Sequence, residues 1–154
     1  MGLFSFLFGK TKTMSRPRKI PMVKWRDGSF PLEVVGESQH QDALVAICGP
    51  HSRDGYDVRC QAVLELEPNN PYDPNAVRVS ISNRKVGYLA RDQAERVGAQ
   101  MREIGMAVAS CQARVRGGWR TNQYDEGNFG VTLAVPARGW IDFGIGSQPT
   151  KKRS

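Results

Sequence analysis

Residues 56–90 read YDVRCQAVLELEPNNPYDPNAVRVSISNRKVGYLA and predict three antiparallel strands. Apolar and polar residues alternate through residues 56–67, which is the period of a strand with one buried face. The apolar positions are Val58, Cys60, Ala62, Leu64 and Leu66. A second alternation covers Val77, Val79 and Ile81, and KVGYLA returns after the turn SNRK. Residues 76–90 are therefore expected to form a hairpin.

The corner NNPYDPNAVRV, residues 69–79, joins the first of these strands to the hairpin. Its two prolines have a fixed φ and lack an amide hydrogen, and they also restrict the preceding residues, Asn70 and Asp73. Tyr72 is thus held on a corner with little freedom. Asn, Pro and Asp are typical of a simple rigid turn. The same stiffness would also suit a site that presents a ring beside a carboxylate.

Two helices and a further strand are expected around this stretch. The segment PLEVVGE, residues 31–37, is expected to form the first strand, and Ser38 to cap a short helix that ends at Gly49. A second helix follows the hairpin, with Asp92 in its first turn and Gly105 as its stop signal. Its apolar positions at helical spacing are Ala94, Val97, Met101 and Ile104.

The last strands are expected over residues 107–116 and 129–135, as a second hairpin. Its facing apolar residues are Ala109, Cys111, Ala113 and Val115 on one strand and Phe129, Val131, Leu133 and Val135 on the other. About six strands, two helices and no repeated strand–helix–strand unit predict a mainly β fold, a small barrel of antiparallel character.

Positive charge is concentrated at the two ends of the chain. The chain has a net charge of +7. Residues 1–26 contain seven basic residues and no acid, and the last four residues contain three more basic residues. The other twelve basic residues stand against all fifteen acids, so the stretch between the ends has a net charge of −3. We expect a basic, mostly flexible tail over 1–28 with an apolar start, one domain over 29–138 and a C-terminal tail over 139–154. Such tails either attract phosphate through counterion release or are simply solvated.

The first ten residues, MGLFSFLFGK, contain an apolar run over residues 3–8. Six residues are too few to span a bilayer or to form the core of a signal peptide. The myristoylation pattern requires Ser or Thr where this chain has Phe6. The run could make a weak contact with an anionic membrane surface, or dock in a partner's groove or in the protein's own core.

The cysteines indicate an intracellular protein, which we expect in the cytoplasm. Cys48, Cys60 and Cys111 form no CxxC pair and fit a reducing compartment, as buried and inert thiols. Cys48 and His51 have a metal-ligand spacing, but the chain offers no second close pair of ligands, so no metal is expected. The sequence contains no GxxxxGK[ST], GxSxG or HExxH motif. We therefore expect neither a cofactor nor enzymatic activity.

The segment GGWRTNQYDEGN, residues 117–128, is predicted to be a loop between the last strands. It carries Trp119 and Tyr124, near Arg114, Arg116 and Arg120. Aromatic faces for bases and cations for phosphates are what a single-strand binder needs, and an ordinary surface hairpin would show the same residues. These side chains are auxiliary candidates for nucleic-acid contact.

Four segments together resemble the HIRAN domain, a module of Swi/Snf-type helicase-like ATPases that also occurs as a small bacterial protein. They are VVGE (34–37), ELEPNNPYDPNAVRV (65–79), KVGYLARDQAERV (85–97) and NFGVTL (128–133), and the likeness spans about residues 32–136. The resemblance implies an OB-like β-barrel that captures the 3′ end of single-stranded DNA. Such a module works alone, or it is recruited to a repair, replication or restriction assembly in which a helicase or nuclease would be its partner.

Carried over residue by residue, the resemblance assigns five roles. Tyr72 corresponds to an aromatic that stacks on the terminal base, and Asp73 to the acid that accepts a hydrogen bond from the 3′-hydroxyl. Tyr88 stands where the family example has a histidine near phosphate, and Arg91 where it has a lysine. Phe129 matches an aromatic that packs against the penultimate nucleotide.

The chain departs from the family pattern after the glycine of VVGE, Gly36. The DNA-binding example has an arginine and a second stacking tyrosine where this chain has Ser38 and Gln39, followed by His40, which could stack in part. The leading hypothesis is a non-enzymatic module that binds free 3′ ends of single-stranded DNA. The alternatives are a protein-interaction or membrane-tethered adaptor, and a metal-dependent hydrolase or nuclease that uses scattered acids.

Overall fold

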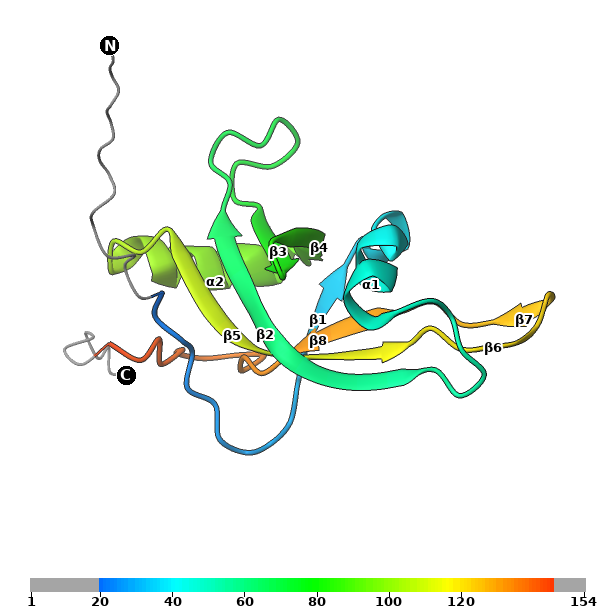
Figure 1. The fold of residues 1–154 in the computed structure, drawn as a ribbon. Coiled ribbons are helices and arrows are strands. Elements are labelled where there is room, and N and C mark those ends of the chain that lie inside the picture. Colours follow the sequence, from blue (N-terminus) through cyan, green and yellow to red (C-terminus); the bar gives the residue numbers. More distant parts are fainter. Residues whose placement is uncertain (1–19, 146–154) are drawn as a thin grey trace, which may run out of the picture.

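The computed structural model describes residues 20–145 and shows a closed antiparallel barrel (Figure 1). Its strands are β1 (Leu32–Val35), β2 (Tyr56–Leu66), β3 (Val77–Ile81), β4 (Arg84–Leu89), β5 (Val108–Gly117) and β8 (Gly130–Leu133). They pair in the order β1-β4-β3-β2-β5-β8, and the barrel closes by pairing of β8 with β1. The prediction of a mainly β fold, a small OB-like antiparallel barrel with two helices, is confirmed.

Two α-helices and a short ribbon complete the described fold. The short helical turn η2 (Glu37–Gln39) precedes α1 (Gln41–Cys48), and α2 (Arg91–Glu103) follows β4. The ribbon consists of β6 (Arg120–Asn122) and β7 (Asp125–Glu126), and it extends away from the barrel beyond β5 and β8 (Figure 1). The segment predicted as a loop is therefore a two-stranded arm.

The barrel interior is filled by the apolar positions that the period-two pattern predicts. Leu64 faces Val79 across β2 and β3, and Ala113 faces Leu133 across β5 and β8. All four side chains are fully buried. Each large aliphatic side chain buried in this way contributes about 1.5–3 kcal/mol relative to an exposed one. Buried apolar residues on both of these strand pairs thus stabilise the barrel.

The β3–β4 hairpin has two irregular features that shape its outer face. Ser82 and Asn83 have φ of 52° and 64°, as a two-residue hairpin turn requires, so the turn is tighter than the predicted SNRK. A register shift lies between Val79 and Ser80. Next to it, Gly87 passes so close to β1 that an added Cβ would lie 2.4 Å from the carbonyl oxygen of Val35.

The short helix begins differently from the prediction, and its end agrees. Ser38 lies within η2, and His40 occupies the N-cap of α1 without a side-chain capping bond. Gln41 anchors the helix start instead: its side chain accepts a hydrogen bond from the Phe129 amide at 2.9 Å and donates to the Phe129 carbonyl at 3.1 Å. A contact distant in sequence therefore fixes the start of the helix, which has no side-chain cap. The helix ends at Cys48, with Gly49 at the C-cap, as predicted.

The folded part extends beyond residues 29–138 at both ends. The Val23 amide donates to the Ser110 carbonyl at 2.8 Å, and the Lys24 amide to the Asp142 carbonyl at 2.8 Å. Val23, Ile141 and Phe143 are all buried in the core. Residues 21–24 and 139–143 are therefore parts of the domain, and the sequence-based boundaries were too narrow because these short apolar segments have no period to detect.

The two ends of the chain bear on the membrane and tail predictions. No helix within residues 20–145 is long and apolar enough to cross a membrane. The apolar run 3–8, the basic residues before Ile20 and the last nine residues lie outside the described residues.

Candidate nucleic-acid interface

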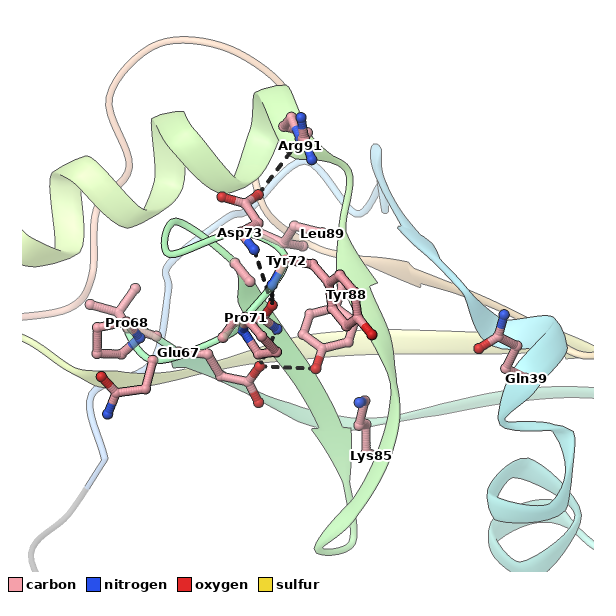
Figure 2. Close-up of a pocket in the computed structure, with 14 residues that line it drawn as sticks. Gln39, Glu67, Pro68, Pro71, Tyr72, Asp73, Lys85, Tyr88, Leu89 and Arg91 are labelled. Atoms are coloured by element: carbon pink, nitrogen blue, oxygen red, sulfur yellow. Dashed lines mark hydrogen bonds and ion pairs between the residues drawn. The ribbon is translucent and has the colours of Figure 1, made fainter.

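The corner between β2 and β3 forms one wall of an open pocket of about 820 Å³ (Figure 2). The end of β4 and the start of α2 form other parts of the wall, and Gln39 lies across the pocket from the corner. The lining includes five of the predicted site residues: Gln39, Tyr72, Asp73, Tyr88 and Arg91. The barrel thus brings together groups that are up to 52 positions apart in the sequence.

Side-chain hydrogen bonds hold the corner in shape. Asn70 Oδ1 accepts from the amides of Tyr72 at 2.8 Å and Asp73 at 3.1 Å. Asp73 Oδ1 accepts from the Asn75 amide at 2.9 Å, which is the local turn bond expected of Asp. Because the prolines have no amide hydrogen, these bonds satisfy the donors that the corner has. The rigid-turn interpretation therefore describes the backbone correctly.

Tyr72 projects from this rigid corner into solvent. Its side chain is 89% exposed, although its backbone amide is fixed by Asn70. An exposed ring on an ordered backbone contributes little to the core, and both of its faces are open to a flat ligand.

Asp73 has one oxygen committed to its turn and one directed at a cation. Its Oδ2 lies 3.7 Å from Nε of Arg91, at the start of α2. The Asp73 side chain is 21% exposed and that of Arg91 is 75% exposed. A carboxylate oxygen and a guanidinium therefore stand together at the pocket wall, and the cation can move toward an incoming anion.

Tyr88 is linked to Glu67, one of the scattered acids of the nuclease alternative, and no sequence pattern indicated this contact. Its hydroxyl donates to Glu67 Oε1 at 2.9 Å, and Asn70 Nδ2 donates to the same oxygen at 2.9 Å. Burial raises the pKa of Glu67, but the hydrogen bonds from Asn70 and Tyr88 and the nearby cations lower it by more. Glu67 is therefore ionised at neutral pH and fixes the ring of Tyr88.

Lys85 is a second residue that the sequence analysis did not single out. Its Nζ lies 4.4 Å from the ring centroid of Tyr88, which is a cation–π distance. The two residues are three apart, so simple alternation would place them on opposite faces of β4. Val86 and Gly87 are both buried, however, and the register shift opposite them returns Tyr88 to the outer face. Only the bulge explains why Lys85 and Tyr88 share a face of β4, so alternation in the sequence did not identify Lys85.

The burial of Phe129 contradicts its predicted role, which was to pack against the penultimate nucleotide. Its ring is 2% exposed and is enclosed by Tyr56, at a centroid distance of 5.7 Å, and by His51, at 5.4 Å. It has no free face for a nucleotide. The ring instead packs directly against Gly118, because a Cβ added to that glycine would lie 2.3 Å from Phe129 Cζ.

The auxiliary candidates lie outside this pocket. Arg114 makes two hydrogen bonds to the carboxylate of Asp57, at 2.8 and 2.7 Å, and Arg120 pairs with Glu126 at 2.6 Å. Arg116 and Trp119 line a different groove, beside β1 and β8. His40 is half-buried and does not line the pocket either. The structure therefore separates these side chains from the corner.

The metal candidates show no ligand set. Within residues 20–145 no group of three or more His, Cys, Asp or Glu side chains could hold a metal ion. Burial raises the pKa of the Cys48 thiol, and it raises that of Cys111 to about 12. His51 packs edge-on against Phe129. Both thiols are therefore protonated at neutral pH in the free protein.

Comparison with known proteins places the chain. The sequence model of the HIRAN domain matches residues 32–123. The chain belongs to the HIRAN domain family. HIRAN domains are known as nucleic-acid-binding modules. The crystal structure of the HIRAN domain of human HLTF matches with 22% identity and a TM-score of 0.26, covering 50% of this chain and 74% of that one. No curated protein matches the chain.

Proposed function

We propose that this HIRAN domain binds single-stranded DNA at a free 3′ end, with the terminal nucleotide in the pocket of Tyr72, Asp73, Tyr88 and Arg91. The observation that carries the proposal is the exposed ring of Tyr72 beside the carboxylate of Asp73, both fixed by the hydrogen bonds of Asn70. The ring stacks on the terminal base. Such stacking contributes about 1–3 kcal/mol per base.

The carboxylate explains why an end is preferred to a continuous strand. A carboxylate repels phosphate, so an acid inside a DNA site disfavours every position that is followed by a phosphate. The last sugar carries a hydroxyl donor and no further phosphate. Asp73 Oδ2, which its own turn does not use, accepts that hydrogen bond. Arg91, which is mostly exposed, neutralises the phosphate on the 5′ side of the terminal sugar.

The stiffness of the corner lowers the cost of binding. The amides of Tyr72 and Asp73 are already bonded in the free protein, so the ring and the acid need little ordering when DNA arrives. We propose a binding module without catalysis, acting in the cytoplasm in DNA repair, replication or restriction together with a helicase or nuclease.

Binding of labelled single strands with a free or a phosphorylated 3′ end tests this function. Tyr72→Ala should weaken binding to the free end by about 5–150-fold, the equivalent of one lost stacked base, whereas Tyr72→Phe should bind nearly as the parent. Tyr124→Ala is the matched control, because Tyr124 is 87% exposed at the tip of the ribbon. The strands should remain intact with Mg²⁺, Mn²⁺ or Zn²⁺ present.

Two results would overturn the proposal. A folded Tyr72→Ala that binds 3′ ends as tightly as the parent would place the site elsewhere. Metal-dependent cleavage that disappears when Asp73 or Glu67 is replaced would favour the nuclease alternative.

A further inference from the structure

We propose that the DNA strand leaves the pocket along the outer face of the β3–β4 hairpin, where Lys85, Arg78 and His40 hold its phosphates. We call these three residues the hairpin strip. This inference rests on the proposed function, because it extends the same site in the 5′ direction of the bound strand. It assigns the second contact surface to the hairpin and not to the auxiliary residues Arg114, Arg116, Trp119 and Arg120.

The strand register places the strip next to the pocket. Arg78 is the cross-strand partner of Tyr88, and Ser80 is the partner of Lys85. Lys85 also lines the pocket, at the end that lies toward the hairpin turn (Figure 2). Three residues of strand span about 10 Å, which is enough for more than one nucleotide beyond the terminal one. The ring of Tyr88 thus has Arg78 beside it on β3 and Lys85 next to it in the direction of the turn.

His40 completes the strip from the side of the helix. Burial lowers the pKa of His40, and the positive charges of Lys85 on β4 and Arg78 on β3 lower it further. His40 occupies the N-cap of α1, and both η2 and α1 pack against β4, which sets His40 beside the strip. Two carboxylates face Arg78: Glu67 lies 3.9 Å from it and already accepts two hydrogen bonds, and Glu65 on β2 is its cross-strand partner. A phosphate between these cations would relieve their mutual repulsion.

The opposite route, across β1, is unfavourable for a polyanion. The groove on that side has three carboxylates in its lining, Glu33, Glu37 and Asp57, and one arginine, Arg116. Arg114 is next to this groove but is engaged by Asp57. Phosphates on this path would approach more negative than positive charge. Electrostatics therefore select the hairpin.

A series of oligothymidylates, from one to six nucleotides with a free 3′ end, tests the route. Affinity of the parent should rise over the first few nucleotides. Lys85→Gln and Arg78→Gln should each weaken binding of the hexanucleotide about fivefold, the effect of one charge contact in a high dielectric. Arg78→Gln, at a residue outside the pocket lining, should leave the mononucleotide nearly unchanged. Each of the two variants should reduce the slope of log affinity against log salt by about 0.7, the value for one phosphate on a single strand.

Two further variants keep the result interpretable. Lys85→Arg retains the charge over Tyr88 and should bind as the parent, which separates charge from packing. Arg116→Gln is the control on the opposite route and should not change binding. Because phosphate binding raises the pKa of His40, affinity of the parent should increase as the pH falls from 8 to 6, and His40→Asn should flatten that dependence.

The proposal is overturned if Arg116→Gln weakens the hexanucleotide while Lys85→Gln does not, since the strand then crosses β1. It is also overturned if the affinity gained with length is the same in Lys85→Gln as in the parent. In both cases the proposed function stands as long as Tyr72→Ala still weakens end binding. If no oligothymidylate binds the parent in a Tyr72-dependent way, the proposed function fails first.

Discussion

Asp73→Asn isolates charge from shape in the pocket. The amide oxygen can still accept from the Asn75 amide, so the turn bond of 2.9 Å is kept. It can also still accept from a 3′-hydroxyl. What disappears is the negative charge, together with the ion pair to Arg91 at 3.7 Å. That pair is largely solvated because the Arg91 side chain is 75% exposed, so its loss should cost less than about 1 kcal/mol of stability.

The magnitude of the binding effect follows from the repulsion that the charge exerts. A carboxylate and a phosphate about 4 Å apart repel by about 1 kcal/mol in water and about 4 kcal/mol at an effective dielectric constant of 20. Asp73 is 21% exposed, which places it between these limits, and Arg91 offsets part of the field. We expect the preference for a 3′-hydroxyl over a 3′-phosphate to fall by about 1–2 kcal/mol, or about 5–30-fold.

Fluorescence anisotropy with labelled hexanucleotides that end in a 3′-hydroxyl or a 3′-phosphate measures this preference directly. The Asp73→Asn variant should gain affinity for the phosphorylated end and lose little for the free end. Asp54→Asn, in an exposed loop outside the pocket lining, is the matched control and should keep the preference of the parent. Unchanged discrimination in folded Asp73→Asn would refute the role given to the charge. Unfolding of the variant would show that the acid serves only its own turn.

Two other predictions concern stability. Phe143→Ala should lower the free energy of unfolding in urea by about 3–5 kcal/mol, because the ring is fully buried although it lies past residue 138. Trp140→Ala is the control, since Trp140 is 48% exposed. A loss in Phe143→Ala no greater than that in Trp140→Ala would contradict the place of Phe143 in the core. Since the pKa of Glu67 is lower in the folded protein than its ordinary value of 4.5, its ionisation stabilises the fold above that pH and the benefit disappears as the pH falls through the lowered value. Glu67→Gln should therefore be less stable than the parent in urea at pH 7, and the difference should shrink as the pH is lowered below 4.5. A difference that stays constant over this range would rule out the linkage.

Local patterns in the sequence were sufficient for most of the barrel. Alternation of apolar residues at Leu64, Val79 and Val115 is set by the pleat of each strand, and the strands themselves are therefore visible without a structure. Helical spacing at Val97 and Met101 marked α2 in the same way. The family motif, read through the resemblance, was sufficient to name the residues of the corner.

Contacts between distant segments were not predictable in this way. Phe129 alternates correctly with its strand, but only the folded chain shows that His51 and Tyr56 enclose its ring. The boundaries at Val23 and Phe143 were missed because irregular segments carry no period, although their burial is complete or nearly so.

The sequence by itself determined the strands, the helix faces and the stiffness of the proline corner, since each depends on the conformational preferences of neighbouring residues. The tertiary structure alone decided which charged groups surround that corner. Glu67 and Lys85 meet at Tyr88 because β2 and β4 both flank β3. The register shift between β3 and β4 also brings Lys85 and Tyr88 to the same face of β4. Electrostatic neighbourhoods depend on distances through space, and those distances exist only after the barrel has closed.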